Sequence, residues 1–459
     1  MASAVRTIDV SSLLEERMLG SYNYKIIILS WLITVFDGFD MLMISFTAPY
    51  MRDELGLDTL MLGNVFSAGL FGMMLGGFFF GYLGDRIGRR PTVIISASCF
   101  GLLTLATAFA QNYHQLLALR FLDGFAIGGM LPLAWALNIE FVPQRFRATV
   151  ITVIMMGFSL GTALAAPLTV WLAPHYGWEG VFVAGGAGTL VCALLLILWL
   201  PESVRFLVAK GHKPEAVARI LNRLEPKLGA TAGDRFVLTD EIDVPAAKQG
   251  FRVSHLFIGD LKWITPLLWL AYIASSLAVY FSASWGPLVL EALKFDRDTA
   301  AFTASIGGLL GAVAGLLLMR FTDGKGPFAV AVYPIIAIPI LLVLGFVTLS
   351  PELFLPGAIL AAAVIGGEHF GVLSIAGIFY PSAIRANGAG WATSVAKVGA
   401  IIGPLVGAWV LASGVPVVRT YALLAVCPAI IAVSAIGIGI VVRRRNTSNT
   451  VNPAIAAAA

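Results

Sequence analysis

Charged residues and cysteines are both scarce in this chain, and each shortage narrows what the protein can be. Asp, Glu, Lys and Arg make up 12% of its 459 residues, whereas soluble domains carry about 25%. The three cysteines, Cys99, Cys192 and Cys427, show neither disulfide nor metal-ligand spacing, so we expect no metal site. The longest polar stretch, 201–260, is too short to house an enzyme. We therefore expect no catalytic residue and no cofactor.

Long apolar runs make up most of the chain instead. Hydrophobic residues account for 58% of the sequence, and the mean hydropathy is +0.88. Because about 20 apolar residues cross a bilayer as a helix, the sequence predicts an all-α integral membrane protein with twelve transmembrane helices. The expected spans lie near 24–48, 60–82, 91–110, 115–142, 148–173, 180–200, 262–290, 299–320, 327–349, 356–380, 387–412 and 420–442. The expected organisation is a six-helix half (1–200), a cytoplasmic linker loop (201–260), a second six-helix half (261–445) and a disordered cytoplasmic tail (446–459).

Basic residues are distributed unevenly between the two sides of the predicted membrane. Only four of the 30 lysines and arginines lie between spans on the outer side: Arg52, Lys294, Arg297 and Arg419. Since short loops rich in Lys and Arg stay in the cytoplasm, both termini are expected there. The net charge of +4 thus reflects the orientation of the chain in the membrane. It is not a nucleic-acid-binding surface, so we expect no nucleic-acid partner.

Similar residues recur at a constant offset of 238 positions. The matching pairs are Asp85 and Asp323, Gly128-Gly129 and Gly366-Gly367, Arg147-Ala148 and Arg385-Ala386, Gly161 and Gly399, and Trp171 and Trp409. Five matches at one register, in corresponding spans, indicate a duplicated six-helix unit. Two such units in parallel are typical of transporters that rock around a site between their halves.

Two aspartates lie near the middle of the first apolar run, in Asp37-Gly38-Phe39-Asp40. A carboxylate at bilayer depth costs at least about 2.5–3.5 kcal/mol, so it rarely occurs there without a function. Three residues apart on a helix, the two side chains share one face. Two such neighbouring carboxylates can exchange protons, although a helix-end pair in contact with water stays the alternative.

The segment from Gly81 to Pro91, with sequence GYLGDRIGRRP, resembles the signature loop between spans two and three of the major facilitator superfamily. This resemblance covers the whole chain and implies that superfamily's twelve-helix fold. An acid at a helix end beside arginines can form a charge latch on the cytoplasmic face of the two halves. The residues expected in this cytoplasmic gate are Gly81, Asp85, Arg86, Gly88, Arg89, Arg147, Asp323 and Arg385.

Within that superfamily, Asp37-Gly-x-Asp40 is similar to the hallmark of the aromatic acid:proton symporters. The segment beginning Tyr380-Pro381-x-x-x-Arg385-Ala386 is similar to that family as well. The resemblance implies uptake of an aromatic carboxylate such as a hydroxybenzoate together with protons, driven by the proton gradient. It also implies a multi-pass protein of the bacterial inner membrane, which we expect to be monomeric.

The residues that we expect to couple transport to protons are Asp37, Asp40, Asp123 and Glu140. Arg120 and Asp123 lie in the outer third of the fourth span, close to the level of Asp40, and Arg120 is expected to contact substrate. Asp123 is an acid that the family pattern does not lead us to expect.

The second half carries a cation in its eleventh span. Lys397 replaces the arginine common in the family, and Glu368-His369 stands in the tenth span where the family usually has a neutral residue. A cation near the midplane is costly unless paired, so Lys397 and Glu368 form the expected resting pair, which a substrate carboxylate could displace. Glu368 would then take a proton or turn to His369. A fixed ion pair that only locks the helices stays the alternative.

Aromatic residues in the seventh span suit an aromatic substrate. Tyr280 and Trp285 could stack on its ring or hydrogen bond its hydroxyl groups, although aromatic residues also gather at membrane interfaces without binding anything. Three other functions stay open. The chain could carry a non-aromatic organic acid such as a muconate-like dicarboxylate, export its substrate, or sense aromatic acids.

Overall fold

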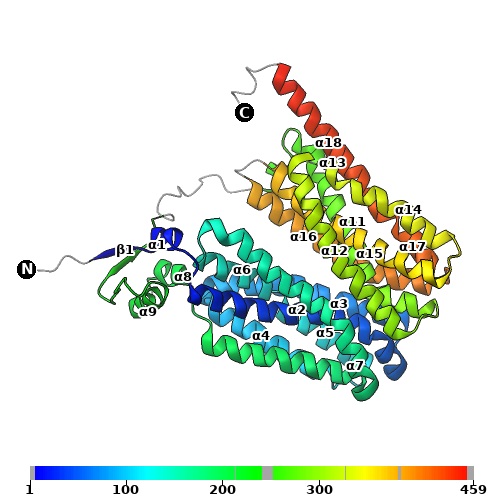
Figure 1. Ribbon diagram of the computed structural model, residues 1–459, viewed down its shortest axis with the longest axis horizontal. Coiled ribbons are helices and arrows are strands. Elements are labelled where there is room, and N and C mark those ends of the chain that lie inside the picture. Colours follow the sequence, from blue (N-terminus) through cyan, green and yellow to red (C-terminus); the bar gives the residue numbers. More distant parts are fainter. Residues whose placement is uncertain (1–5, 212, 240–251, 326, 381–383, 452–459) are drawn as a thin grey trace, which may run out of the picture. The chain divides into compact units, whose positions relative to one another are not determined.

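The computed structural model describes residues 6–211, 213–239, 252–325, 327–380 and 384–451 (Figure 1). Nearly all of this part of the chain is helical. The long helices are α2 (Ser21–Leu55), α3 (Thr59–Ile87), α4 (Arg89–Thr107), α5 (Tyr113–Ile127), α6 (Met130–Phe141), α7 (Gln144–Trp199), α11 (Leu261–Ala292), α12 (Arg297–Lys325), α14 (Val332–Phe346), α15 (Pro351–Phe379), α16 (Arg385–Ala412) and α18 (Val426–Val451). The shorter elements are β1 (Thr7–Asp9), α1 (Val10–Glu16), α8 (Val204–Ala209), α9 (Pro214–Leu224), β2 (Arg235–Val237), η1 (Val253–Phe257), α13 (Pro327–Val330) and α17 (Arg419–Leu424).

Within the described residues, eleven helical stretches are long and apolar enough to cross a membrane. One of them, α7, is 56 residues long and breaks at Gly177, where φ is 69° and ψ is 178°. Its two arms match the spans expected at 148–173 and 180–200. Counted as two, they give the twelve expected spans and confirm the predicted fold class.

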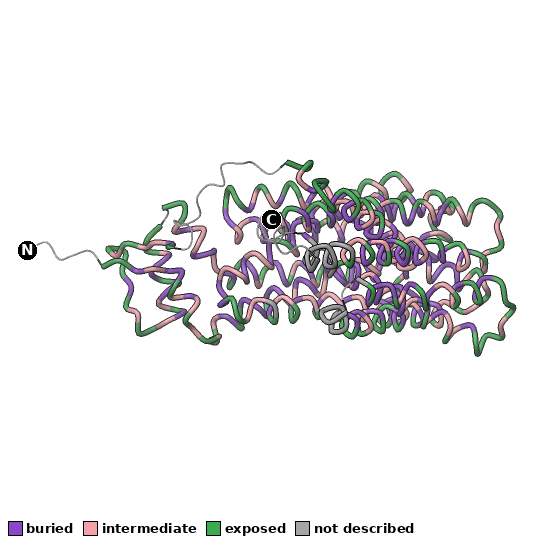
Figure 2. The backbone as a smooth tube through the Cα atoms, turned by 90° about the horizontal axis from the view of Figure 1, so that it is seen from above, coloured by how far each residue is buried: buried purple, intermediate pink, exposed green. Residues whose placement is uncertain are grey.

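Apolar side chains also cover the outside of the helices. Exposed stretches run along the long helices and alternate with buried ones (Figure 2). At the end of α7, for example, Ile197, Leu198 and Trp199 are all exposed. Large exposed apolar surfaces are rare on soluble monomers, so this surface fits a protein whose solvent is lipid.

The chain divides into two compact units. Unit 1 comprises residues 1–41, 71–164 and 175–249, and unit 2 comprises 42–70, 165–174 and 250–459. Helices α2, α3 and α7 therefore contribute residues to both units. We describe the two units separately.

The same close helix contact is found once within each unit, at positions related by the offset seen in the sequence. A Cβ atom on Gly161 of α7 would lie 1.9 Å from the carbonyl oxygen of Val35 in unit 1. In unit 2, a Cβ atom on Gly399 of α16 would lie 2.1 Å from the carbonyl oxygen of Ile273. Both members of the pair shift by 238 positions. The duplicated residues therefore make the same helix–helix contact, which only a residue without a side chain permits.

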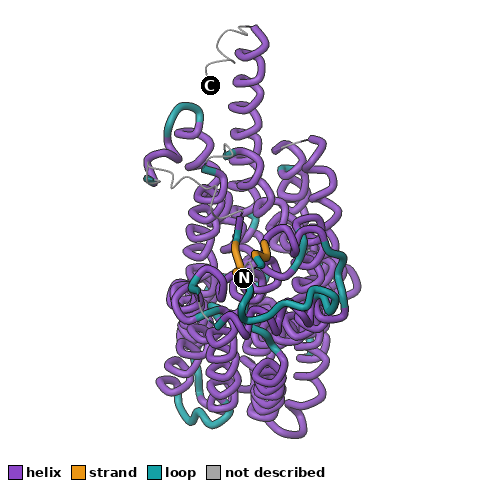
Figure 3. Tube along the Cα trace, turned by 90° about the vertical axis from the view of Figure 1, so that its left-hand side faces the viewer, coloured by secondary structure: helices purple, strands orange, loops and turns teal. Residues whose placement is uncertain are grey.

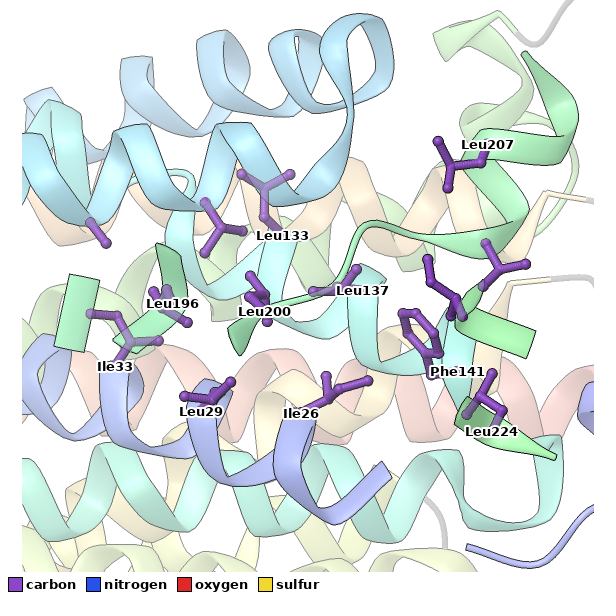
Figure 4. Packing of buried hydrophobic residues seen from close by; sticks show 14 of the residues in the cluster. Ile26, Leu29, Ile33, Leu133, Leu137, Phe141, Leu196, Leu200, Leu207 and Leu224 are labelled. Carbon is purple, nitrogen blue, oxygen red and sulfur yellow. The ribbon is translucent and has the colours of Figure 1, made fainter. Parts of the chain in front are cut away.

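Leucine, isoleucine and phenylalanine side chains form the core of unit 1 at the N-terminal end of α2. Ile26, Leu29 and Ile33 of α2 belong to the same buried cluster as Leu133 and Leu137 of α6 (Figure 4). The cluster also includes Leu196 and Leu200 at the end of α7, Leu207 of α8 and Leu224 of α9. The core thus extends beyond the spans into the segment after α7.

The region expected as a linker loop contains regular structure. In α9 the apolar residues Val217, Ile220, Leu221 and Leu224 are buried on one face, because their spacing of three and four follows the helical period. Strand β2 pairs in parallel with β1, with Ile8 opposite Phe236 (Figure 3). The N-terminal segment is thereby held against the region after α7 within unit 1.

Candidate functional site

Arg120 lies at the centre of a buried charge cluster in unit 1. It donates hydrogen bonds to both carboxylate oxygens of Asp40, at 3.0 and 2.8 Å, and a third to Asp123 at 2.6 Å. The other oxygen of Asp123 accepts a hydrogen bond of 2.9 Å from Thr104. Arg120, Asp40 and Asp123 are at most 5% exposed. Helix α2 therefore meets α5 at this guanidinium group, and α4 joins the cluster through Asp123.

Asp37 is buried on the same helix as Asp40 but has a different environment. It is 2% exposed, and its Oδ2 atom has no hydrogen-bond partner among the described residues. The cluster thus brings three carboxyl groups near a single guanidinium group. Burying unpaired charge is costly, so a proton bound to this cluster would offset its excess negative charge.

Gly38 sets how closely α2 approaches α7 between the two aspartates. A Cβ atom at this position would lie 2.1 Å from the carbonyl oxygen of Phe158. That separation is far inside van der Waals contact, so any side chain would push the helices apart. The glycine of the Asp37-Gly-x-Asp40 motif therefore positions both carboxyl groups.

The ion pair expected between Lys397 and Glu368 does not form in the structure. Glu368 is fully buried in α15, and both of its carboxylate oxygens are without a hydrogen-bond partner in the described part of the chain. Lys397, on α16, is half-buried. The prediction failed because the spacing along each helix does not determine how two helices are rotated toward each other.

His369 forms a hydrogen bond with a serine that was not among the expected site residues. Its Nδ1 atom lies 2.8 Å from Oγ of Ser275 on α11. Ser275 is the residue that corresponds to Asp37 at the offset of 238 positions. A polar residue thus occupies the same repeat position in both halves, with a carboxyl group in one and a hydroxyl group in the other.

The two aromatic candidates on α11 differ in their surroundings. Trp285 is 1% exposed, its indole nitrogen donates to the carbonyl oxygen of Pro404 at 2.9 Å, and Phe66 packs against its ring edge. Tyr280 is half-buried. In this conformation Trp285 is a packing residue of unit 2.

The loop between α3 and α4 carries its own charge network. Arg89 pairs with Asp85 at 3.0 Å and with Glu140 at 3.2 Å. Glu140 therefore forms its ion pair with Arg89 in this network and does not belong to the cluster around Arg120. Glu202 accepts hydrogen bonds from the backbone nitrogens of Arg89 and Arg90, where a negative charge is favourable because helix α4 begins there.

Gly88 allows this arrangement of Glu202. Its φ of 111° lies in the left-handed region that favours glycine, and a Cβ atom would lie 2.2 Å from a carboxylate oxygen of Glu202. Among the described residues, no atom outside the neighbouring backbone lies within 4 Å of the corresponding position on Gly81. The loop therefore needs glycine at Gly88 for its shape and for the approach of Glu202.

The other expected gate residues are found in different places. Arg86 donates to the hydroxyl oxygen of Tyr82 at 3.1 Å. Arg147 pairs with Glu15 of α1 at 2.6 Å, so it connects the start of α7 to the N-terminal segment. The side chains of Asp323 and Arg385 lie outside the described residues.

Comparison with known proteins agrees with this architecture. A family model described as Major Facilitator Superfamily matches residues 30–404. The chain belongs to the major facilitator superfamily. The fold of this transporter is also similar to that of the xylose transporter XylE from E. coli, with a TM-score of 0.68, 18% identity and coverage of 90% of this chain and 97% of that one.

Relatives of this transporter agree with the finer resemblance seen in the motifs. It is 34% identical to a gallate transporter of Pseudomonas putida over 432 residues, 94% of each chain. It is also 34% identical to the 4-hydroxybenzoate transporter PcaK of Pseudomonas putida over 425 residues, 90% of this chain and 91% of that one. The resemblance to the aromatic acid:proton symporter family is confirmed by these relatives.

A further charge network of this transporter lies within unit 2 and was not among the expected sites. Arg52 near the end of α2 pairs with Glu291 of α11 at 3.1 Å. Arg297, at the start of α12, pairs with Glu291 at 3.4 Å and also with Asp53. The available signal was that Arg52 and Arg297 are two of the few basic residues expected on the outer side.

Proposed function

We propose that this transporter takes up an aromatic carboxylate together with protons by alternating access in a bacterial inner membrane, with both termini in the cytoplasm. The observation that carries the proposal is the burial of Asp37, without a donor to its Oδ2 atom, beside the Arg120–Asp40–Asp123 cluster. The names of the relatives, which are transporters of gallate and 4-hydroxybenzoate, support the substrate class.

Asp37 is the proton carrier in this proposal. A proton that arrives with the anion cancels its charge, which matters because one elementary charge crossing the membrane potential is worth about 2.3 kcal/mol per 100 mV. Asp40 and Asp123 are bound to Arg120, so they hold the guanidinium group and set the local charge. After Asp37 releases its proton to the cytoplasm, the empty carrier can return to its outward-facing state.

Lys397 binds the substrate carboxylate in the proposed site. It is the cation that α16 presents without an ion pair among the described residues, and a lysine attracts an anion as a compact point charge. His369, fixed through Nδ1 by Ser275, offers its other ring nitrogen to a hydroxyl group on the ring. Tyr280 supplies an aromatic surface on the same helix as Ser275.

Uptake into proteoliposomes tests this proposal directly. Purified protein would be reconstituted and given radiolabelled 4-hydroxybenzoate, gallate, benzoate or cis,cis-muconate with an imposed pH gradient, acidic outside. We expect accumulation of at least one aromatic acid, collapse of accumulation by a protonophore, and substrate counterflow without a gradient. Accumulation of muconate alone would identify the substrate as a non-aromatic dicarboxylate instead of an aromatic carboxylate. Counterflow of no acid at all would contradict transport of these compounds and favour a sensor.

The direction of coupling is tested with the same vesicles. An inward proton gradient should drive the acid inward, and an outward gradient should slow its entry. Accumulation driven only by the opposite gradient would identify an exporter.

A further inference from the structure

Helix α2 carries a buried polar face that leads away from Asp37 toward the N-terminal end of the helix. Ser30, Thr34 and Asp37 are separated by four and three residues, so their side chains lie on one face. Their exposed fractions are 3%, 1% and 2%. Polar groups at this depth are costly and are usually retained for a function.

Asn138 of α6 meets this face. Its amide nitrogen donates to Oγ of Ser30 at 2.7 Å and to the carbonyl oxygen of Ala134 at 2.8 Å, so both of its amide hydrogens are used. Its Oδ1 atom is buried and accepts no hydrogen bond from the described residues. Thr34 donates to the carbonyl oxygen of Ser30 at 2.7 Å.

Helix packing alone explains only part of this arrangement. A hydrogen bond between spans stabilises their association, and the bond from Asn138 to Ser30 does this. An unsatisfied buried acceptor, however, costs about 1–3 kcal/mol. Two such acceptors, Oδ2 of Asp37 and Oδ1 of Asn138, are found along one polar face. Both atoms are suited to accept a hydrogen bond from a proton donor that is present during part of the transport cycle.

We propose that the hydroxyl groups of Thr34 and Ser30 form a proton relay between Asp37 and the N-terminal end of α2, and that Asn138 is a positioning residue of this relay. The relay rests on the proposed function, because it begins at the proton carrier Asp37. Residues four apart on a helix have Cβ atoms about 5–6 Å apart, a gap that one water molecule bridges.

The relay moves one proton without changing any bond between heavy atoms. Asp37 gives up its proton to a lone pair of the next oxygen, and each oxygen passes its own hydrogen onward as it accepts one. The Thr34 hydroxyl group turns away from the carbonyl oxygen of Ser30 to take part, and water at the N-terminal end of α2 takes up the last proton. Asn138 neither gains nor loses a proton. Asn138 donates to Oγ of Ser30 and so leaves the Ser30 hydroxyl hydrogen available to the next acceptor. The Oδ1 atom of Asn138 accepts a hydrogen bond from the molecule that takes up the proton at the N-terminal end of α2.

Two transport measurements on the full-length protein separate a relay from a packing role. Net uptake of 4-hydroxybenzoate driven by a pH gradient requires that the protein release a proton in every cycle. Counterflow does not require this release, because the carrier returns with its substrate and proton still bound. We expect Thr34→Val and Ser30→Ala to lower net uptake at least about tenfold, as loss of a proton-transfer group does, with counterflow unchanged. Thr34→Ser, which keeps the hydroxyl group, should restore net uptake.

Thr47 provides a matched control on the same helix. It is also fully buried, and its hydroxyl group donates to the carbonyl oxygen of Met43 at 2.8 Å, four residues back. It lies on the other side of Asp37 in the sequence. Thr47→Val should therefore leave both net uptake and counterflow unchanged.

Each remaining outcome contradicts a specific statement. Wild-type net uptake in Thr34→Val and Ser30→Ala, with coupling lost in Asp37→Asn, overturns the relay alone. An equal fall in net uptake and counterflow, with a lower thermal midpoint, also overturns it and assigns the residues to packing. Full coupling in Asp37→Asn overturns the proton carrier of the proposed function, and the relay with it.

Discussion

Arg120 binds Asp40 through both of its terminal nitrogens, at 3.0 and 2.8 Å, and makes the two aspartates of the first span unequal. Asp40 is the counterion of a buried guanidinium group. Asp37, one turn earlier, retains an oxygen without a partner among the described residues. The two carboxyl groups therefore serve different purposes, although they look equivalent in the motif.

Asn replacement of these two aspartates should separate stability from coupling. Asp40→Asn leaves a buried guanidinium group partly unpaired, which costs about 3–5 kcal/mol when one partner of a buried ion pair is removed. Asp37→Asn removes no ion-pair partner, so it should keep the thermal midpoint in detergent while abolishing proton-driven uptake. A lower midpoint in Asp37→Asn than in Asp40→Asn would contradict this division.

Gly38→Ala should disrupt the contact between α2 and α7. The new methyl group would meet the carbonyl oxygen of Phe158 at 2.1 Å, and overpacking of this kind costs about 1–3 kcal/mol or more. We expect a lower thermal midpoint and loss of uptake. Gly308→Ala is the control, because no atom of the described residues outside its own helix backbone lies within 4 Å of its new methyl group. An equal loss of stability in both variants would show that any methyl group in a helix has this effect.

Lys397→Met should abolish uptake of the anion without unfolding the protein. Loss of a charge-assisted hydrogen bond of about 1.5–3 kcal/mol weakens binding roughly 10- to 150-fold. Because no ion pair joins Lys397 to Glu368 among the described contacts, the thermal midpoint should change little. Lys397→Arg should retain binding, measured by isothermal titration with 4-hydroxybenzoate. Unchanged affinity in Lys397→Met would remove this residue from the site.

The pairing of β1 with β2 should weaken in acid. Burial raises the pKa of Asp9, but hydrogen bonds from Thr239, Ser12 and Ser11 outweigh this and lower the pKa below its usual value. A lowered pKa stabilises the folded segment fully above the usual pKa, and this stabilisation is lost as the pH falls through the folded value. Hydrogen exchange of residues 7–16, corrected for intrinsic rates, should therefore increase below about pH 4.

Asp9→Ala provides the comparison for this pH effect. Asp9 caps the first turn of α1 through the backbone nitrogen of Ser11, and removing such a cap costs about 1 kcal/mol. The variant should show fast exchange of this segment at neutral pH and little further change in acid. An acid response as large as that of the wild-type protein would assign the effect to other groups.

The sequence predicted features that depend on local patterns. Span positions follow from apolar runs, and the offset of 238 positions identified the duplication before the contacts of Gly161 and Gly399 showed it. The buried aspartates of the first span were found because a carboxyl group at bilayer depth is conspicuous. The helix at Pro214–Leu224 was overlooked, although Val217, Ile220, Leu221 and Leu224 follow the helical period.

Contacts between helices were much harder to predict. The sequence indicated that Arg120 lies at the level of Asp40, but it did not show that Asp40 alone of the two first-span aspartates would bind both guanidinium nitrogens. The sequence suggested an ion pair between Lys397 and Glu368, but these two residues form no ion pair in the structure. It also grouped Glu140 with the proton-coupling acids, whereas Glu140 is bonded to Arg89.

By itself, then, the sequence determined the twelve spans, the duplication and the presence of costly buried charge, because these depend on hydropathy and on spacing along one helix. Only the tertiary structure decided which charges meet, which acceptors stay without a donor and where Asn138 contacts α2. Those relationships depend on the rotation and separation of packed helices. Both are set by close contacts such as that of Gly38 with the carbonyl oxygen of Phe158.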